Sequence, residues 1–210
     1  RNQHRAWALV ESRNLVEKEI LVNQIIMETK IHGLILTGGH SRRMGRDKAL
    51  ISDGNQTALE KIYDLLKHSL QEVFVSVRAD QKEEAKRAEF KLIVDQNQYS
   101  GPMAGILSAF NSYPDIAWLI VACDMPYLDT ETIDQLIQNR NKEKVATLFI
   151  SPKDGRPEPL CSIYEPLFFK TVSNDNRLIQ NNSPRDTLML MDTLLIKPEN
   201  PKSLINTNYP

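Results

Sequence analysis

The sequence has few of the residues that mark several large classes of protein. Its 210 residues include only 2 cysteines and 4 histidines. Cys123 and Cys161 are too few for a disulfide framework, and they are not spaced as a metal-binding cluster. The histidines form no cluster, and no Ser–His or Cys–His arrangement points to a covalent intermediate. Because cysteine-poor chains are typical of reducing compartments, we expect a cytoplasmic protein.

The chain also lacks an excess of charge of either sign and lacks long apolar runs. It has 26 Lys and Arg against 27 Asp and Glu, a net charge of −1. We therefore expect no nucleic-acid partner, and any anion-binding site must be local. No run of 18 apolar residues occurs, so no membrane-spanning segment is predicted. A hydrophobic content of 41% is ordinary for a globular domain of this length.

Glycine is scarce, yet three of the 8 glycines fall in residues 36–48, which read LTGGHSRRMGRDK and include four basic residues. The stretch follows a short apolar run. Gly38 and Gly39 permit a sharp turn and close approach of the backbone to a ligand. A glycine-rich basic loop after a strand is typical of a phosphate site. It is neither a Walker P-loop nor a GxGxxG fingerprint. The side chains expected to bind phosphate oxygens are those of Arg42, Arg43 and Lys48.

From residue 31 onward, strands and helices are predicted to alternate. β-rich runs lie at 33–37, 73–77, 91–94 and 117–121. Helices are predicted from a capping box at Thr57 and Glu60, over about 80–89, and from near Pro102. This alternation indicates an α/β fold with three layers, in which helices cover both faces of a mostly parallel sheet. Ligands bind such sheets beyond the C-terminal ends of the strands.

The second half of the chain predicts a different organisation. A helix over 129–139 leads to a strand near 145–150, a turn at 153–156 and a strand at 159–164. This pattern predicts a hairpin or a mixed sheet edge. A last strand is predicted at 192–197.

One domain with an N-terminal appendage is predicted from this organisation. Residues 31–210 form the α/β domain. Residues 1–30 have helical periodicity without glycine or proline, and are predicted as a helical extension or the tail of an upstream domain.

Residues 36–48 resemble the motif L-A-G-G-x-S-x-R-M-G-x-D-K of the molybdenum cofactor guanylyltransferases (MobA-type), which have the Rossmann-like nucleotide-diphospho-sugar transferase fold. Thr37 replaces the usual alanine. Related cytidylyltransferases usually have Ala-Ala-Gly at 37–39, so the second glycine favours the guanylyl branch. Later stretches also resemble family elements, namely Asp95, GPMAGI at 101–106, ACDMP at 122–126, EPL at 158–160 and NTN at 206–208.

The resemblance implies a set of site residues. The implied catalytic residues are Lys48, Arg42, Arg43 and Asp124. The implied nucleotide-binding residues are Leu36, Thr37, Gly38, Gly39, Lys48, Ser76, Asp95, Gly101, Gly105 and Asp124. Asp124 is also the implied ligand of Mg²⁺, and the implied pterin-binding residues are Glu158, Asn206 and Asn208. From the residues alone, Asp124 is equally a cap of the following turn, and Asp95 is equally a residue that ends a strand.

The resemblance also implies an activity. It is transfer of GMP from Mg·GTP to molybdenum-bound molybdopterin, which yields the guanine dinucleotide cofactor and pyrophosphate. The implied partners are GTP and molybdopterin, together with proteins that donate or accept the molybdenum cofactor. Two alternatives stay open. One is another nucleotidyltransferase of this fold, acting on molybdopterin with CTP or on another small-molecule phosphate. The other is a non-catalytic nucleotide-binding module.

Overall fold

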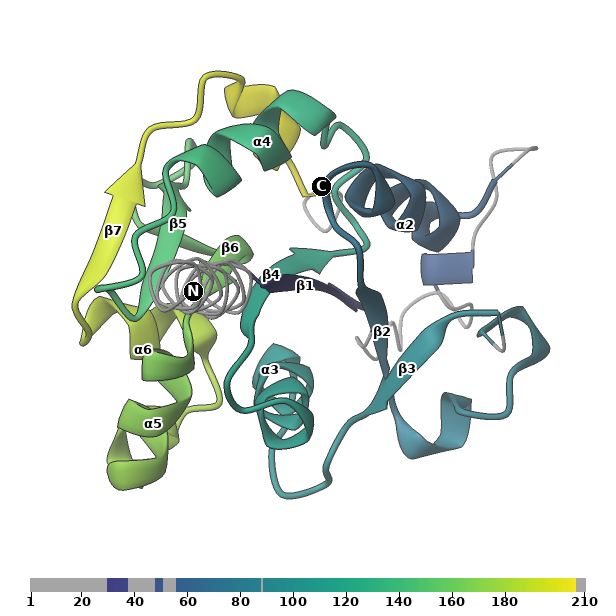
Figure 1. The fold of residues 1–210 in the computed structure, drawn as a ribbon, viewed down its shortest axis with the longest axis horizontal. Helices are drawn as coiled ribbons and strands as arrows, with labels where there is room; N and C mark the ends of the chain where they lie inside the picture. Colours follow the sequence, from purple (N-terminus) through teal and green to yellow (C-terminus); the bar gives the residue numbers. More distant parts are fainter. Residues whose placement is uncertain (1–29, 38–47, 51–55, 88, 207–210) are drawn as a thin grey trace, which may run out of the picture. The chain divides into compact units, whose positions relative to one another are not determined.

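The computed structural model describes residues 30–37, 48–50, 56–87 and 89–206 (Figure 1). The chain separates into two compact units, Arg1–Lys30 and Ile31–Pro210. Apart from Lys30, the first unit lies outside the described residues, so the helical extension stays a prediction. None of the described helices has the length and apolar character needed to cross a bilayer.

The described strands form one mixed sheet in the order β3-β2-β1-β4-β6-β5-β7 (Figure 1). Their bounds are β1 Ile31–Leu36, β2 Val73–Val77, β3 Lys91–Val94, β4 Ala117–Ala122, β5 Ala146–Ile150, β6 Pro157–Tyr164 and β7 Thr193–Ile196. All neighbouring pairs are parallel except β4–β6 and β5–β6, in which β6 runs antiparallel. The predicted mostly parallel sheet is confirmed, and so are the hairpin and the last strand.

Helices cover both faces of this sheet, which confirms the predicted three layers. The α-helices are α2 Ala58–Ser69, α3 Pro102–Ser112, α4 Thr130–Gln138, α5 Pro166–Asn174 and α6 Pro184–Met189. Short 3₁₀ helices are η1 Lys48–Leu50, η2 Ala79–Gln81, η3 Ala85–Arg87, η4 Asn176–Ile179 and η5 Pro201–Leu204. Helices α2 and α4 pack on one face, and α3, α5 and α6 lie on the other (Figure 1).

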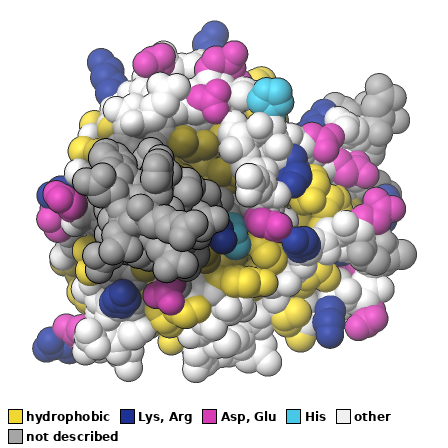
Figure 2. All heavy atoms as spheres, viewed as in Figure 1, with side chains coloured by type: hydrophobic (Ala, Val, Ile, Leu, Met, Phe, Trp, Pro, Cys, Tyr) yellow, Lys and Arg dark blue, Asp and Glu magenta, His cyan; other side chains and the backbone are white. Residues whose placement is uncertain are grey.

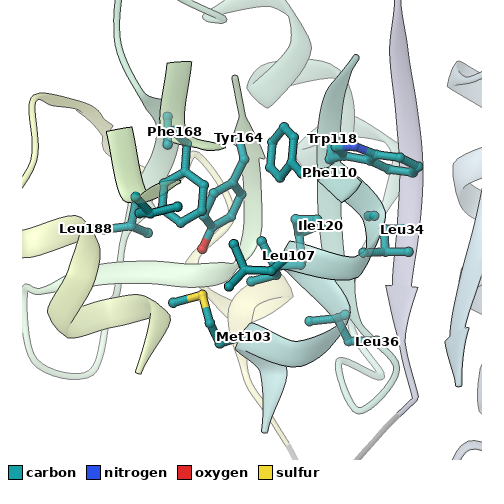
Figure 3. Close-up of a cluster of buried hydrophobic side chains, with 14 of the residues drawn as sticks. Leu34, Leu36, Met103, Leu107, Phe110, Trp118, Ile120, Tyr164, Phe168 and Leu188 are labelled. Carbon is teal, nitrogen blue, oxygen red and sulfur yellow. The ribbon is translucent and has the colours of Figure 1, made fainter. Parts of the chain in front are cut away.

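The core consists of two apolar clusters separated by the sheet. Successive side chains of a strand point to opposite faces, so Leu34 and Leu36 join the cluster under α3, whereas Ile35 joins the cluster under α2. Figure 3 shows the first cluster, in which Phe110 of α3 and Phe168 of α5 lie beside strand residues. Both faces of β1 are therefore buried, which explains why this strand reads as a continuous apolar run.

Helix α2 begins as its sequence predicts. The Thr57 hydroxyl accepts a hydrogen bond from Glu60 N at 3.2 Å, and the Glu60 carboxylate accepts one from Thr57 N at 2.5 Å. Leu59, Ile62 and Leu66 are buried against the sheet. This reciprocal capping satisfies two backbone donors at the helix start.

The prediction of a helix over 80–89 is wrong. The structure has η2 and η3 there, and the backbone donors of Gln81, Glu84 and Arg87 each bond three residues back rather than four. Gln81 and Arg87 are both buried and make side-chain hydrogen bonds, Gln81 accepting one from Arg78 N at 3.1 Å. The Lys-, Glu- and Ala-rich composition favours a helix, but these inward polar contacts determine the backbone path.

Residues 165–191 carry α5, η4 and α6, none of which is predicted from the sequence. Over the described part of the face drawn in Figure 2, acidic and basic side chains are interspersed, as expected for a net charge of −1.

Candidate active site

Of the predicted site residues that the structure describes, Leu36, Thr37, Ser76, Asp95 and Asp124 lie at or just beyond the C-terminal ends of the parallel strands. β1 has β2 on one side and β4 on the other. The chain runs outward from β1 through β2 to β3 and then returns to add β4 on the opposite side of β1. Cys123 N donates to Leu36 O at 3.2 Å, which holds the ends of β1 and β4 together. Thr37 and Asp124 therefore follow two adjacent strands. Such a switch point is where open α/β sheets bind ligands.

A pocket of about 530 Å³ opens beside this point. Its walls come from the residues after β2, the residues after β3 and the start of α3. They are Arg78, Ala79, Asp80, Asp95, Gln96, Asn97, Tyr99, Ser100, Gly101 and Ala104. Of the predicted nucleotide-binding residues, Asp95 and Gly101 line it. Gly101 has a φ of +62°, which a side chain would strain, and it is the N-cap of α3, where its carbonyl accepts from Ala104 N at 3.1 Å.

Asp95 is oriented by neighbours on β2. Its carboxylate accepts a hydrogen bond from the Ser76 hydroxyl at 2.6 Å, and its backbone N–H donates to Val77 O at 2.8 Å. Burial raises the pKa of Asp95 above its usual value, while the Ser76 hydrogen bond and the Arg78 charge act in the opposite direction. Ser76 thus holds the carboxylate of a pocket wall, a role that the sequence pattern alone does not reveal.

Arg78 and Asp80 form a second polar part of the pocket wall, which sequence reasoning missed. Arg78 Nε and Nη2 donate to the Asp80 carboxylate at 3.0 and 3.1 Å. Its position in the sequence could have indicated a site residue, because residue 78 directly follows the predicted strand at 73–77. The pocket therefore presents both a carboxylate and a guanidinium.

Gly105 allows α3 to lie close to the sheet. A Cβ atom at this position would lie 2.3 Å from Ser76 Oγ and 2.7 Å from Leu36 Cδ2. The structure thus shows a packing reason for this glycine, and its contact with a nucleotide stays a prediction. The same close approach brings α3 against the hydroxyl that orients Asp95.

Thr37 is buried at the end of β1 and is hydrogen-bonded on both sides. Its hydroxyl donates to Ser76 O at 2.6 Å and accepts from Arg87 Nη1 at 2.8 Å. Arg87 is a further residue that sequence reasoning missed. The threonine at this position, where the family motif has alanine, therefore has a specific partner.

Glu158 lies on the side of Asp124 that faces away from β1, at the start of β6. Because β6 is antiparallel to β4, the start of β6 lies at the same sheet edge as the end of β4. The Glu158 carboxylate accepts from Leu160 N at 3.1 Å and from Arg185 Nη2 at 3.4 Å. Burial raises the pKa of Glu158 above its usual value, and the charge of Asp124 adds to this rise.

Arg185 joins two carboxylates at this edge. Its Nη1 donates to the Asp154 carboxylate at 3.0 Å, in the turn between β5 and β6. Sequence reasoning did not single out this arginine, because no element was predicted around it. The predicted pterin side of the site therefore contains a guanidinium as well as Glu158.

The donor chemistry at this edge suits Mg²⁺. Among the described residues no group of three or more His, Cys, Asp or Glu side chains could hold a metal ion. Mg²⁺ does not need one, since it takes one or two carboxylates and completes its shell with phosphate oxygens and water. Asp124, with Glu158 as a neighbouring carboxylate, fits that requirement.

Several predicted residues lie outside the described part of the chain. They are Gly38, Gly39, Arg42, Arg43 and Asn208. Lys48 begins η1, but its side chain is not described, and Asn206 follows η5. The roles of these residues stay predictions.

The chain resembles known proteins over most of its length. Residues 33–186 match the family model described as the MobA-like NTP transferase domain. The chain is 39% identical over 185 residues to a "Molybdenum cofactor biosynthesis bifunctional protein" of Synechocystis sp., covering 88% of this chain but only 53% of that protein. A "Probable molybdenum cofactor guanylyltransferase" of Bacillus mycoides is 34% identical over 140 residues, covering 65% of this chain and 68% of the relative.

Solved structures support the fold. "Molybdopterin-guanine dinucleotide biosynthesis protein A" from Archaeoglobus fulgidus superposes with a TM-score of 0.67 at 23% identity, covering 85% of this chain and 93% of that one. A 4-diphosphocytidyl-2C-methyl-D-erythritol synthase superposes with a TM-score of 0.63 at 13% identity, covering 86% and 93%. These likenesses show the nucleotidyltransferase fold, and the family match goes further: the chain belongs to the MobA-like NTP transferase domain family of nucleotidyltransferases.

Proposed function

We propose that this chain transfers GMP from GTP to the phosphate of molybdenum-bound molybdopterin, yielding the guanine dinucleotide form of the cofactor and pyrophosphate. The names of the relatives support this substrate pair. Within the structure, the observation that carries the proposal is the pocket whose wall presents Asp95 and Arg78 together.

Two of the charged groups that line the pocket, those of Asp95 and Arg78, match the edges of guanine. Guanine presents N1–H and N2–H₂ as donors on one edge, and O6 and N7 as acceptors on another. A carboxylate such as Asp95 accepts hydrogen bonds only, and the guanidinium of Arg78 donates only. Cytosine can also accept from Arg78 through N3 and O2, but it offers the carboxylate only its N4 amino group, whereas guanine offers both N1–H and N2–H₂. That mismatch favours GTP over CTP.

The proposed GMP transfer does not require the protein to remove a proton from the acceptor. The acceptor phosphate is already an anion at neutral pH, so no side-chain base has to activate it. The main difficulty is to bring two anions together in line. Asp124, beside Glu158, would hold Mg²⁺, which when bound neutralises charge on the triphosphate. The predicted basic residues Arg42, Arg43 and Lys48 would bind the phosphate oxygens and stabilise the transition state.

The acceptor would occupy the β4–β6 side of the site. Glu158, Asn206 and Asn208 are its predicted contacts, and Arg185 adds a positive charge to this side. Donation of molybdopterin to this edge, and release of the product, would involve proteins that carry the molybdenum cofactor. On this proposal the nucleotide and the acceptor meet near Asp124.

The proposal is tested by incubating the purified chain with GTP, Mg²⁺ and molybdopterin, and measuring pyrophosphate together with the dinucleotide product. We expect both to form in equal amounts, and neither to form when EDTA is added. Product from CTP but not from GTP would support a cytidylyltransferase instead. GTP binding without pyrophosphate release would indicate a non-catalytic nucleotide-binding module.

A further inference from the structure

A fully buried arginine lies behind the candidate nucleotide pocket. Arg87 ends η3 and has no exposed side-chain surface. Its Nε donates to the Glu84 carboxylate at 2.7 Å, and its Nη1 donates to Thr37 Oγ1 at 2.8 Å. Thr37 directly precedes Gly38, the first glycine of the predicted phosphate-binding loop.

The contact with Thr37 continues to the pocket wall. Thr37 Oγ1 donates to Ser76 O, and the Ser76 hydroxyl donates to the Asp95 carboxylate, both at 2.6 Å. A hydroxyl has one proton and two acceptor lone pairs, so Thr37 can accept from Arg87 and at the same time point its proton at Ser76 O. Arginine is always a donor, and it therefore fixes the direction of this hydrogen bond. The contacts join the ends of β1 and β2 to Asp95.

Stability alone does not account for an arginine at this position. Removing a guanidinium from water is costly, and apolar side chains of similar volume often replace buried ion pairs without loss of stability. Glu84, its carboxylate partner, is still 39% exposed, so the ion pair is only partly shielded from water. The segment that connects β2 to β3 also has 3₁₀ helices in place of the predicted α-helix, and Arg87 points inward from the second of them. A role in the neighbouring site explains these costs.

We propose that Arg87 is a positioning residue for nucleotide binding. Through Thr37 it fixes the C-terminal ends of β1 and β2, and hence the Asp95 carboxylate. The inference rests on the proposed function, since it takes GTP as the ligand. It also explains the threonine at position 37, because alanine would offer Arg87 no acceptor.

The chain offers a matched control in Arg140. Its side chain is 10% exposed and makes two hydrogen bonds of 2.6 and 2.8 Å to Glu165, which is 3% exposed. Arg140 follows α4, and Glu165 follows the C-terminal end of β6, at the opposite sheet edge from the start of β6. Replacing either arginine with methionine thus removes a buried cation, but only Arg87 contacts the predicted site.

The test is GTP affinity by calorimetry, with the melting temperature of each variant measured in parallel. We expect Arg87→Met to weaken GTP binding about tenfold or more, and Arg87→Lys, which keeps a charged donor, to restore part of it. Arg140→Met should lower the melting temperature while changing GTP affinity less than about twofold. Combining Arg87→Met with Thr37→Ala should weaken binding no further than Thr37→Ala alone, because Thr37→Ala already removes the acceptor through which Arg87 acts.

Unchanged GTP affinity in Arg87→Met, or an equal loss in Arg140→Met, would overturn the inference. If Arg87→Met does not fold, Thr37→Ala decides, since wild-type affinity in that variant would also overturn it. These outcomes differ from a failure of the proposed function, in which the wild-type chain itself would not bind GTP.

Discussion

Ser76 donates a hydrogen bond of 2.6 Å to Asp95 across the ends of β2 and β3, so a small residue on one strand orients the charged residue that follows the next. Burial raises the pKa of Asp95, and this hydrogen bond opposes the rise by favouring the ionised form. The pair thus keeps a partly buried carboxylate available as a hydrogen-bond acceptor.

Ser76→Ala should raise the pKa of Asp95 further, because the ionised form loses its hydrogen bond. As the solution is acidified, Asp95 in this variant would become protonated at a higher pH than in the wild type. GTP binding that needs the ionised carboxylate would therefore begin to weaken at that higher pH. We expect the midpoint of the plot of GTP affinity against pH to move to higher pH than in the wild type. Superimposable pH profiles for the two proteins would show that the hydrogen bond does not govern the Asp95 carboxylate.

Asp95→Asn should separate stability from binding. The folded-state pKa of Asp95 is raised, so the wild type loses stability as the pH rises from the ordinary value of about 3.9 through that raised pKa. The amide has no such dependence and can still accept from Ser76. The melting temperature of Asp95→Asn relative to wild type should therefore increase with pH across that window.

In the same variant, GTP affinity should fall by about tenfold or more, since an unpaired donor group on the base costs roughly 1–3 kcal/mol. Calorimetric titration at neutral pH measures this. A variant that binds GTP normally would remove Asp95 from the base pocket, whatever its stability.

Asp124→Asn should lower turnover on the order of 10²- to 10³-fold, because the amide is a poorer ligand for Mg²⁺ near the triphosphate. It should also raise the Mg²⁺ concentration needed for half-maximal rate. Steady-state pyrophosphate release gives both values. Asp129→Asn is the control, since Asp129 accepts from Thr132 N at 2.9 Å as the cap of α4 and lies outside the proposed site. Similar losses of turnover in the two variants would argue against a metal-binding role for Asp124.

Gly105→Ala should destabilise the fold by about 1–3 kcal/mol, because the added methyl group collides with the Ser76 hydroxyl and with Leu36. Urea unfolding measures the loss. Part of it should return in Gly105→Ala combined with Ser76→Gly, which removes both the hydroxyl and the Cβ that the methyl group meets. A double variant no more stable than Gly105→Ala would place the strain elsewhere.

The central strands could be predicted from the sequence because their signals are local. β2 and β3 were predicted with their observed bounds, and the Thr57–Glu60 capping box marked the start of α2. Apolar runs between turn residues suffice for strands that are buried on both faces.

Several of the failures have a common physical cause, which is contact between residues far apart in the chain. The helix predicted over 80–89 is absent because Arg87 reaches Thr37, 50 positions away, and this contact outweighs local helix propensity. The same contact gives Thr37 a role that its small size did not suggest. Arg185 was missed because its partner Asp154 lies 31 positions earlier.

Nucleotide selectivity with molybdopterin as acceptor tests the central claim most directly. GTP and CTP are titrated with Mg²⁺, and dinucleotide formation is followed for each. We predict that GTP binds at least about tenfold more tightly, the ratio supplied by ~1.4 kcal/mol, and that it gives the faster product formation. Equal affinity, or a preference for CTP, would contradict the assignment of GMP transfer.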